Sequence, residues 1–185
     1  MSGGPARPGI PLEIPTERLR LRAPHPDFAG DMNAAIRDSF AELHAWMDWA
    51  RVMPTVAQSR AQALAARRAF LAREDLQLVL FCGDRVVGSC GLHRIDWSVP
   101  RFEIGYWVRT PDVGRGYATE AAAALAHLAF EGLGARRVEI RADTRNARSR
   151  AIPERLGYEL EGVLRRDALH TDGSVRDTAV YARVR

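Results

Sequence analysis

Residues 106–120, YWVRTPDVGRGYATE, carry the strongest indication of how this chain folds. Its aromatic start favours a strand, and its end opens an alanine-rich segment that favours a helix. Between them, Gly114 and Gly116 allow the backbone to turn tightly and to approach a ligand closely. The N–H groups of such a loop, with the N-terminus of the following helix, can bind an anion such as a pyrophosphate. The glycine pair alone fits a plain turn equally well, and it lacks the third glycine of a dinucleotide-binding loop.

Alternating and apolar segments predict further strands and helices on both sides of this stretch. The predicted strands are 16–22, 76–81, 85–93, 101–108, 137–142, 158–164 and 175–184. The predicted helices are 28–39, 56–73, 116–130 and a short one between Asn146 and Gly157, with 41–49 as a short helix or turn. Asp27, Thr55 and Asn146 are the expected helix caps. The resulting order is β-α-α-β-β-β-α-β-α-β-β.

The connections between these segments indicate the topology of the sheet. Turns at 83–84 and 171–174 predict hairpins and therefore antiparallel pairing. The helix 116–130 lies between two strands and predicts one parallel crossover. We therefore expect an α/β (mixed α+β) fold, with a mixed, mostly antiparallel seven-stranded sheet flanked by helices. A length of 185 residues suits one domain, expected at 14–185 after a flexible N-terminal lead at 1–13.

Composition excludes several classes of protein. The chain is 46% apolar and 27% charged, as soluble proteins are, and no apolar run is long enough to span a bilayer. The N-terminus lacks the apolar core of a signal peptide, so we expect a cytoplasmic protein. All 27 basic residues are arginine, which excludes lysine Schiff-base chemistry and a Walker-type phosphate loop. Cys82 and Cys90 are expected to be free thiols, and no metal site is visible.

The net positive charge lies near the C-terminus. Residues 134–185 hold 12 arginines against 8 acids, whereas residues 1–133 hold 15 of each. Most of the excess falls within 134–155. A solvated face, a site for a polyphosphate ligand and a nucleic-acid surface all fit this cluster. Nucleic acid is the weakest of these, and we expect no specific nucleic-acid partner.

A second motif, NARSRAIPERLGY at 146–158, is informative together with the first. In their order and spacing, these motifs resemble the GNAT superfamily of acyl-CoA-dependent N-acyltransferases. The resemblance is closest to the RimJ/RimL branch, which acetylates the N-termini of ribosomal proteins and other amines. Further segments share it, and together they span roughly 14–184: 16–22, 43–49, 91–96, 103–107 and 180–182.

The resemblance implies an acetyl-CoA site on the glycine loop and the strand before it. The family's phosphate-binding pattern, Gln/Arg-x-x-Gly-x-Gly/Ala, falls on 113–118, where Val113 replaces the usual polar side chain. N–H groups of 114–119 would bind the phosphates, and the strand 104–108 would pair with the pantetheine and polarise the thioester oxygen. The implied cofactor-binding residues are Tyr106, Trp107, Val108, Val113, Gly114, Arg115, Gly116, Tyr117, Ala118, Thr119, Asn146 and Ser149.

The chain departs from the family at two positions implied in proton transfer. Pro153 stands where many members carry a tyrosine that protonates the CoA thiolate, and Ala168 stands where the RimL branch often carries a glutamate. Ser149 matches a RimL-branch serine and is implied to lie near the CoA sulfur. Glu103 is the alternative general base, by direct contact or through water. A solvated serine and a salt bridge in the sheet are the structural alternatives for Ser149 and Glu103.

Pro153 also has a consequence that follows from its own chemistry. A proline has no N–H, so the carbonyl four residues earlier, that of Ser149, loses its helical donor. We expect a local kink or a free acceptor there.

Three residues are expected on the amine side of the site. Trp46 and Trp49 are three apart and would share a helix face, either as a pocket wall or as core packing. His93 is expected to bind the substrate, and it is a further candidate base together with Asp96; a core or loop histidine is the alternative. Asp48 could meet a cationic amine.

The resemblance therefore implies an N-acetyltransferase that acts by direct attack of a primary amine on acetyl-CoA in a ternary complex. An α-amine has a pKa of about 7.8 and a lysine one of about 10.4, so a site without an obvious strong base suits an α-amine better. The implied acceptor is a protein or peptide N-terminus, such as that of a ribosomal protein. Alternatives are a small amine (aminoglycoside, polyamine or metabolite), a longer acyl group, or an acyl-CoA-binding regulatory protein without catalysis. The family also implies a homodimer, with no membrane and no metal.

Overall fold

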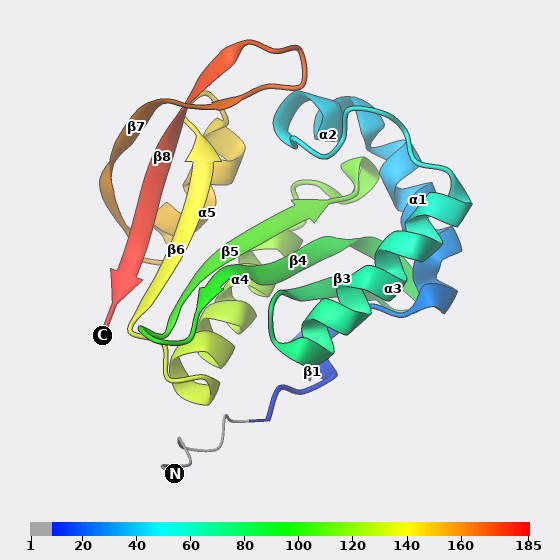
Figure 1. The fold of residues 1–185 in the computed structure, drawn as a ribbon, viewed down its shortest axis with the longest axis horizontal. Coiled ribbons are helices and arrows are strands. Elements are labelled where there is room, and N and C mark those ends of the chain that lie inside the picture. The colour runs from blue at the N-terminus through cyan, green and yellow to red at the C-terminus, as the bar shows by residue number, and fades with distance from the viewer. Residues whose placement is uncertain (1–8) are drawn as a thin grey trace.

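Eight strands form one sheet within residues 9–185, which are the residues that the computed structural model describes (Figure 1). The strands are β1 (Glu13–Pro15), β2 (Arg20–Arg22), β3 (Leu76–Cys82), β4 (Arg85–Asp96), β5 (Arg101–Val108), β6 (Arg137–Asp143), β7 (Glu159–Leu169) and β8 (Val175–Val184). Their order in the sheet is β1-β2-β3-β4-β5-β6-β8-β7. Among the strand pairs of residues 9–185, only β5–β6 is parallel, so the predicted mixed, mostly antiparallel sheet is confirmed, with eight strands instead of the predicted seven.

The strand that sequence analysis missed is β1. Most of the predicted lead lies outside the described residues, but Glu13–Pro15 pairs antiparallel with β2, with Ile14 opposite Leu21. Three residues that end in a proline give too little periodicity to identify as a strand. Because Pro15 has no N–H to donate, it is tolerated only at a sheet edge, and β1 occupies that edge.

The helices are α1 (Ala29–Asp38), α2 (Phe40–Trp46), α3 (Val56–Ala72), α4 (Tyr117–His127) and α5 (Ala147–Arg155). The predicted cap at Thr55 is confirmed, as a capping box with Gln58. The predicted cap at Asp27 is wrong. A short 3-10 turn, Pro26–Phe28, precedes α1, and its cap is His25, whose ring accepts from the N–H of Asp27.

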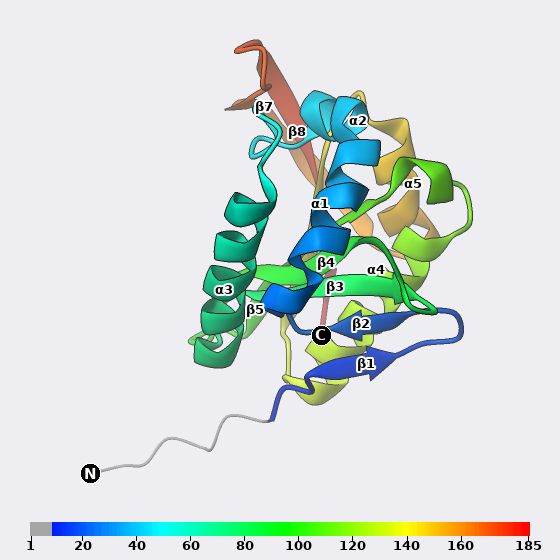
Figure 2. The same ribbon diagram turned by 90° about the vertical axis from the view of Figure 1, so that its right-hand side faces the viewer.

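The helices cover both faces of the sheet, with α1 and α3 on one face and α4 and α5 on the other (Figure 2). Alternate residues of β5 show this division. Phe102 and Ile104 belong to the main core with Tyr117 of α4, whereas Trp107 packs with Met32 of α1. Each residue of β5 is thereby assigned to the α4–α5 face or to the α1–α3 face.

The two parallel strands separate toward their C-terminal ends, as Figure 1 shows. They pair only from Arg101–Glu103 with Arg137–Glu139. Beyond that point, within the described residues, β5 pairs only with β4 and β6 only with β8. We call the space between residues 104–108 and 140–143 the wedge. Its facing strand edges carry backbone groups that no neighbouring strand uses.

Candidate active site

The glycine loop connects the open end of β5 to α4. Gly114 and Gly116 have φ angles of +87° and +83°, in the left-handed region that glycine adopts without strain. Gly116 caps α4 without a side-chain contact, and the first helical N–H with a backbone partner is that of Glu120, which donates to Gly116 at 3.0 Å. Within the described part of the chain, the N–H groups between the loop and Glu120 are therefore available to an anion.

Side chains from the β1–β2 connection hold this loop in place. Arg18 donates to the carbonyl oxygen of Arg115 at 2.7 Å and forms an ion pair with Glu120 at 2.7 Å. Thr16 donates to Glu120 at 2.6 Å. Burial opposes ionisation of Glu120, but the hydrogen bonds from Thr16 and Arg18 outweigh it and lower the pKa of the carboxyl. Sequence reasoning missed these anchors because they lie about a hundred positions from the loop.

A second anchor lies in the turn before the glycines. The carboxylate of Asp112 is 1% exposed and accepts two hydrogen bonds from Arg85, at 2.6 and 2.7 Å. Those hydrogen bonds hold the pKa of Asp112 below its usual range. The loop is thus fixed at both ends by charged groups from other parts of the sheet, which leaves its amides oriented before any ligand binds.

The side chains of the predicted cofactor residues do not all face the loop. Tyr117 is buried, with its hydroxyl 3.3 Å from the sulfur of Cys82, and Trp107 lies on the opposite face of the sheet from α4. Val113 is 44% exposed, so the missing polar side chain leaves no buried gap. Since the side chains of Tyr117 and Trp107 point elsewhere, these two residues can contact a ligand at the loop through their backbone groups.

The second motif places Ser149 beside the wedge. The side chain of Asn146 caps α5 by accepting from the N–H of Ser149 at 3.0 Å, so the predicted cap is confirmed. Tyr106, on the open part of β5, donates its hydroxyl hydrogen to the carbonyl oxygen of Ser149 at 3.0 Å. Pro153 has no N–H to donate to the Ser149 carbonyl, and this carbonyl accepts from Tyr106 instead. The free acceptor that the sequence predicts is therefore present. The position of Ser149 relative to a CoA sulfur stays a prediction.

Glu103 lies at the closed end of the wedge, opposite Glu139. Its carboxylate is 3.4 Å from each of two arginines, Arg94 and Arg141, so it makes the salt bridge in the sheet that was the alternative to a catalytic role. Burial raises its pKa, while the two guanidinium groups act in the opposite direction. It lines a hollow of about 120 Å³ together with Phe102 and charged side chains. A general base in this position would have to break an existing ion pair.

His93 of β4 is paired directly opposite Glu103 of β5, and its ring lies on the α1–α3 face of the sheet. Its Nδ1 is 2.7 Å from a carboxylate oxygen of Asp75. The imidazole occupies the space above two glycines: a Cβ on Gly91 or on Gly105 would lie 2.8 or 2.9 Å from the ring. The ring is therefore fixed in direction and lies over the strand that borders the wedge. Asp75 was not identified from the sequence, since it lies in the turn before β3.

The other candidate base, Asp96, is engaged in its own turn. Its carboxylate accepts from the hydroxyl of Ser98 at 2.5 Å and from two backbone N–H groups, and these bonds hold its pKa below the usual range. A lowered pKa is the opposite of what a base near neutral pH requires.

Trp46 and Trp49 do not share a helix face, so that prediction is wrong. The helix α2 ends at Trp46, and Trp49 follows in a turn. The ring centroid of Trp46 lies 6.4 Å from that of His170, whereas Trp49 lies 6.4 Å from Trp107. Asp48 is paired with Arg176 at 3.4 Å rather than free for a cationic amine.

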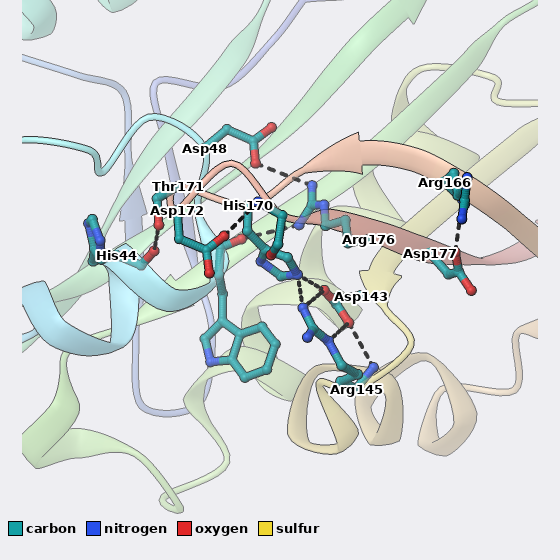
Figure 3. Close-up of polar contacts among 12 residues, drawn as sticks. His44, Asp48, Asp143, Arg145, Arg166, His170, Thr171, Asp172, Arg176 and Asp177 are labelled. Carbon is teal, nitrogen blue, oxygen red and sulfur yellow. Dashed lines mark hydrogen bonds and ion pairs between the residues drawn. The ribbon is translucent and has the colours of Figure 1, made fainter.

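The tip of the β7–β8 hairpin lies against α2, as Figure 3 shows. Thr171 donates to the carbonyl oxygen of His44 at 2.6 Å. His170, 7% exposed, is 2.8 Å from the carboxylate of Asp143, the last residue of β6. The hairpin thereby links the C-terminal end of β6, at one border of the wedge, to the helix that carries Trp46. Sequence reasoning missed Asp143. Its position as a polar residue at the C-terminal end of a strand is the signal that could have identified it.

Much of the arginine cluster is neutralised within the protein. Arg137 pairs with Glu139 and Glu161, and Arg141 pairs with Glu139 and Glu103. The cluster therefore stabilises the junction of β5, β6 and β7. These ion pairs explain part of the positive charge for which the sequence suggested an anion site or a solvated face.

Three further features concern the described residues alone. Both cysteines are free thiols, as predicted, and burial raises the pKa of Cys90. No group of three or more His, Cys, Asp or Glu residues at 9–185 is arranged to hold a metal ion. None of the helices in this part of the chain has the length and apolar character needed to cross a membrane.

Comparison with known proteins gives consistent matches. Residues 18–159 match the family model described as "Acetyltransferase (GNAT) domain". A curated relative from Bacillus subtilis (strain 168), "Putative ribosomal N-acetyltransferase YdaF", is 30% identical over 168 residues, which cover 90% of this chain and 91% of that protein. A solved structure described as a probable acetyltransferase has a TM-score of 0.88 and 28% identity, and covers 94% of this chain and 97% of that one. The ribosomal L7/L12 α-N-protein acetyltransferase RimL in complex with coenzyme A has a TM-score of 0.87 at 24% identity, over 93% and 97% of the two chains.

Proposed function

Because the chain belongs to the GNAT acetyltransferase family, we propose that it transfers the acetyl group of acetyl-CoA to the N-terminal α-amine of a protein. The observation that carries this proposal is the wedge between β5 and β6, which opens toward the end of β5 from which the glycine loop continues. A strand edge and a set of oriented N–H groups are thus combined in one site. An amide-containing arm that ends in a pyrophosphate fits both.

Acetyl-CoA has the two chemical features that this site accommodates. Its pyrophosphate binds to the N–H groups of 114–119, with the helix dipole of α4 behind them. Its pantetheine amides pair with the free edge of β5 at 104–108, as an added strand would. The N–H groups of that edge also donate to the thioester oxygen when negative charge develops on it.

The reaction exchanges one bond to the acetyl carbon for another. The amine nitrogen attacks the thioester carbonyl, the C–S bond breaks and its electron pair stays on sulfur. The proton that the nitrogen loses balances the one that the CoA thiolate gains. We place Ser149 on the thiolate side. On the amine side we place His93, whose ring Asp75 orients, with Glu103 as second candidate because two arginines already pair with it.

An α-amine suits this site better than a lysine. At neutral pH roughly a tenth of α-amines are uncharged, against fewer than one lysine in a thousand, a difference of about 3.5 kcal/mol in preparing the nucleophile. The relative YdaF is named for ribosomal acetylation. We therefore propose a ribosomal protein N-terminus as the acceptor and the cytoplasm as the place of action. A homodimer stays a prediction, which sedimentation of the full chain tests.

A competition assay tests this proposal. The full chain is incubated with acetyl-CoA and an equimolar mixture of a lysine-free peptide with a free N-terminus, an N-terminally blocked peptide with one lysine, spermidine and an aminoglycoside. Mass spectrometry is expected to show one added acetyl group on the free N-terminus first. Acetylation of a small amine or of lysine alone would contradict the proposed acceptor. Binding of acetyl-CoA without turnover on any amine would support the regulatory alternative.

A further inference from the structure

Pro153 lies inside α5 and leaves one carbonyl without its helical partner. The helix runs over Ala147–Arg155, and the residue whose N–H would bond to the carbonyl of Ser149 is Pro153. A proline in this position also pushes its ring against that carbonyl. An unpaired carbonyl in a partly buried place needs another donor. The sequence of α5 therefore requires a group outside the helix to donate to the Ser149 carbonyl.

The replacement donor comes from the opposite side of the wedge. Tyr106 of β5 donates to the carbonyl oxygen of Ser149 at 3.0 Å, and its hydroxyl oxygen is 3.4 Å from Ser149 Oγ. Burial raises the pKa of Tyr106 to about 12, so the phenol keeps its proton at neutral pH and remains a donor. The contact joins β5 to α5 where β5 and β6 no longer pair.

The backbone of Ser149 is therefore held at both of its polar groups. Its N–H donates to the side chain of Asn146 at 3.0 Å, and its carbonyl accepts from Tyr106 at the same distance. Neither of these two bonds uses the hydroxyl hydrogen of Ser149, which faces the hydroxyl oxygen of Tyr106 at 3.4 Å, a longer contact that a ligand can replace. Holding a side chain through both flanking backbone groups fixes the direction of its Cβ, which is what a positioned donor requires.

We propose that Pro153 and Tyr106 act as a pair that positions Ser149, whose hydroxyl donates a hydrogen bond to the CoA thiolate as it leaves. Pro153 frees the Ser149 carbonyl, and Tyr106 binds that carbonyl and draws the first turn of α5 toward the wedge. This inference rests on the proposed function. The electron pair of the broken C–S bond is stabilised on sulfur by the hydroxyl of Ser149, and the proton that finally reaches sulfur balances the one that the amine loses.

Tyr106 acts by positioning and does not itself deliver the proton. Burial raises the pKa of Tyr106, so its phenol holds its proton more firmly than an exposed tyrosine does. Its single hydroxyl hydrogen is already used in the bond to the Ser149 carbonyl. Of the two hydroxyl groups, that of Ser149 makes the weaker contact, at 3.4 Å to the Tyr106 oxygen, and can turn its hydrogen toward a thiolate.

A set of variants separates positioning from a purely structural contact. The set is Tyr106→Phe, Pro153→Ala and the double variant, each measured for Tm, kcat and KM for acetyl-CoA. Tyr106→Phe is expected to lower Tm and to reduce kcat at least tenfold, with a smaller change in KM. In the double variant the N–H of residue 153 can bond to the Ser149 carbonyl, so Tm is expected to recover while kcat stays low. Recovery of kcat together with Tm would overturn the proposal.

Two further comparisons complete the test. In a Ser149→Ala background, Tyr106→Phe is expected to change kcat less than twofold, because the group that it positions is gone; an undiminished tenfold loss would overturn the proposal. Tyr158→Phe is the matched control, since Tyr158 is also buried and its hydroxyl has no hydrogen-bond partner among the described residues. We expect it to leave kcat unchanged whichever residue occupies position 153.

Failure of this inference differs from failure of the proposed function. A wild-type protein that turns over no amine contradicts the function, and the Tm values of the same set still test the pair. The Tm loss from Tyr106→Phe must then shrink when residue 153 is alanine. Additive Tm changes would overturn the pairing of Tyr106 with Pro153.

Discussion

At the level of single residues, the backbone of Ser149 is held by two hydrogen bonds, while its hydroxyl makes a longer contact, 3.4 Å to the Tyr106 oxygen. A hydrogen-bond donor that faces a developing negative charge in a water-excluded site lowers the activation barrier by about 2 to 4 kcal/mol. We expect Ser149→Ala to lower kcat by roughly thirty- to several-hundredfold, with little change in KM for acetyl-CoA. Steady-state kinetics on an N-terminal peptide provide the measurement. An unchanged kcat would assign Ser149 to the solvated face of α5.

Glu120 gives a prediction for the dependence of stability on pH. Hydrogen bonds from Thr16 and Arg18 lower its pKa in the folded protein despite burial, so the unfolded chain binds its proton more readily. The stabilisation is therefore present above the ordinary carboxyl pKa of about 4.3 and is lost as the pH falls through the lower, folded value. We expect Glu120→Gln to cost about 1 to 3 kcal/mol at pH 7, and the difference from wild type to shrink below pH 4. Urea unfolding at several pH values tests this, and a constant difference would contradict it.

At the scale of elements, the β4–β5 pair forms a cradle for the ring of His93. A Cβ at Gly105 would lie 2.9 Å from the ring, so Gly105→Ala forces either His93 or the strand to move. We expect a loss of about 1 to 3 kcal/mol in stability and a higher KM for the amine. Thermal unfolding and acceptor titrations measure the two effects.

The control for this change lies in His93 itself. With the ring removed, a Cβ at position 105 meets no close neighbour, since both of its close contacts are atoms of the His93 ring. In a His93→Ala background we therefore expect Gly105→Ala to cost almost no stability. If the cost stays the same, the backbone rather than the ring requires this glycine.

The sequence predicted elements well where local patterns decide them. The helix cap at Thr55, the parallel crossover and the acceptor left free by Pro153 follow from residues close in the chain. The donor to that acceptor could not be predicted, because Tyr106 is 43 positions away. For the same reason the anchors of the glycine loop were missed. The prediction that Trp46 and Trp49 share a helix face was wrong. Residues three apart share a face only within a continuous helix, and α2 ends at Trp46.

At the scale of the whole molecule, segments far apart in the chain border the wedge. The glycine loop lies at the end of β5, while the β7–β8 hairpin links the C-terminal end of β6 to α2. We expect Thr171→Val, which removes the 2.6 Å bond to His44, to raise KM for the amine a few-fold and leave KM for acetyl-CoA unchanged. Equal changes in both constants would show that the hairpin does not act on the acceptor alone.

Calorimetric titration of acetyl-CoA into the wild-type protein, Gly114→Ala and Gly134→Ala tests directly whether the glycine loop binds the cofactor. Both glycines have positive φ and open space where a Cβ would lie, so the two substitutions are matched in backbone strain. We expect saturable binding to the wild type, a loss of at least tenfold in affinity for Gly114→Ala, and near wild-type affinity for Gly134→Ala. No binding to the wild type, or equal affinity in all three proteins, would contradict the placement of acetyl-CoA at the glycine loop.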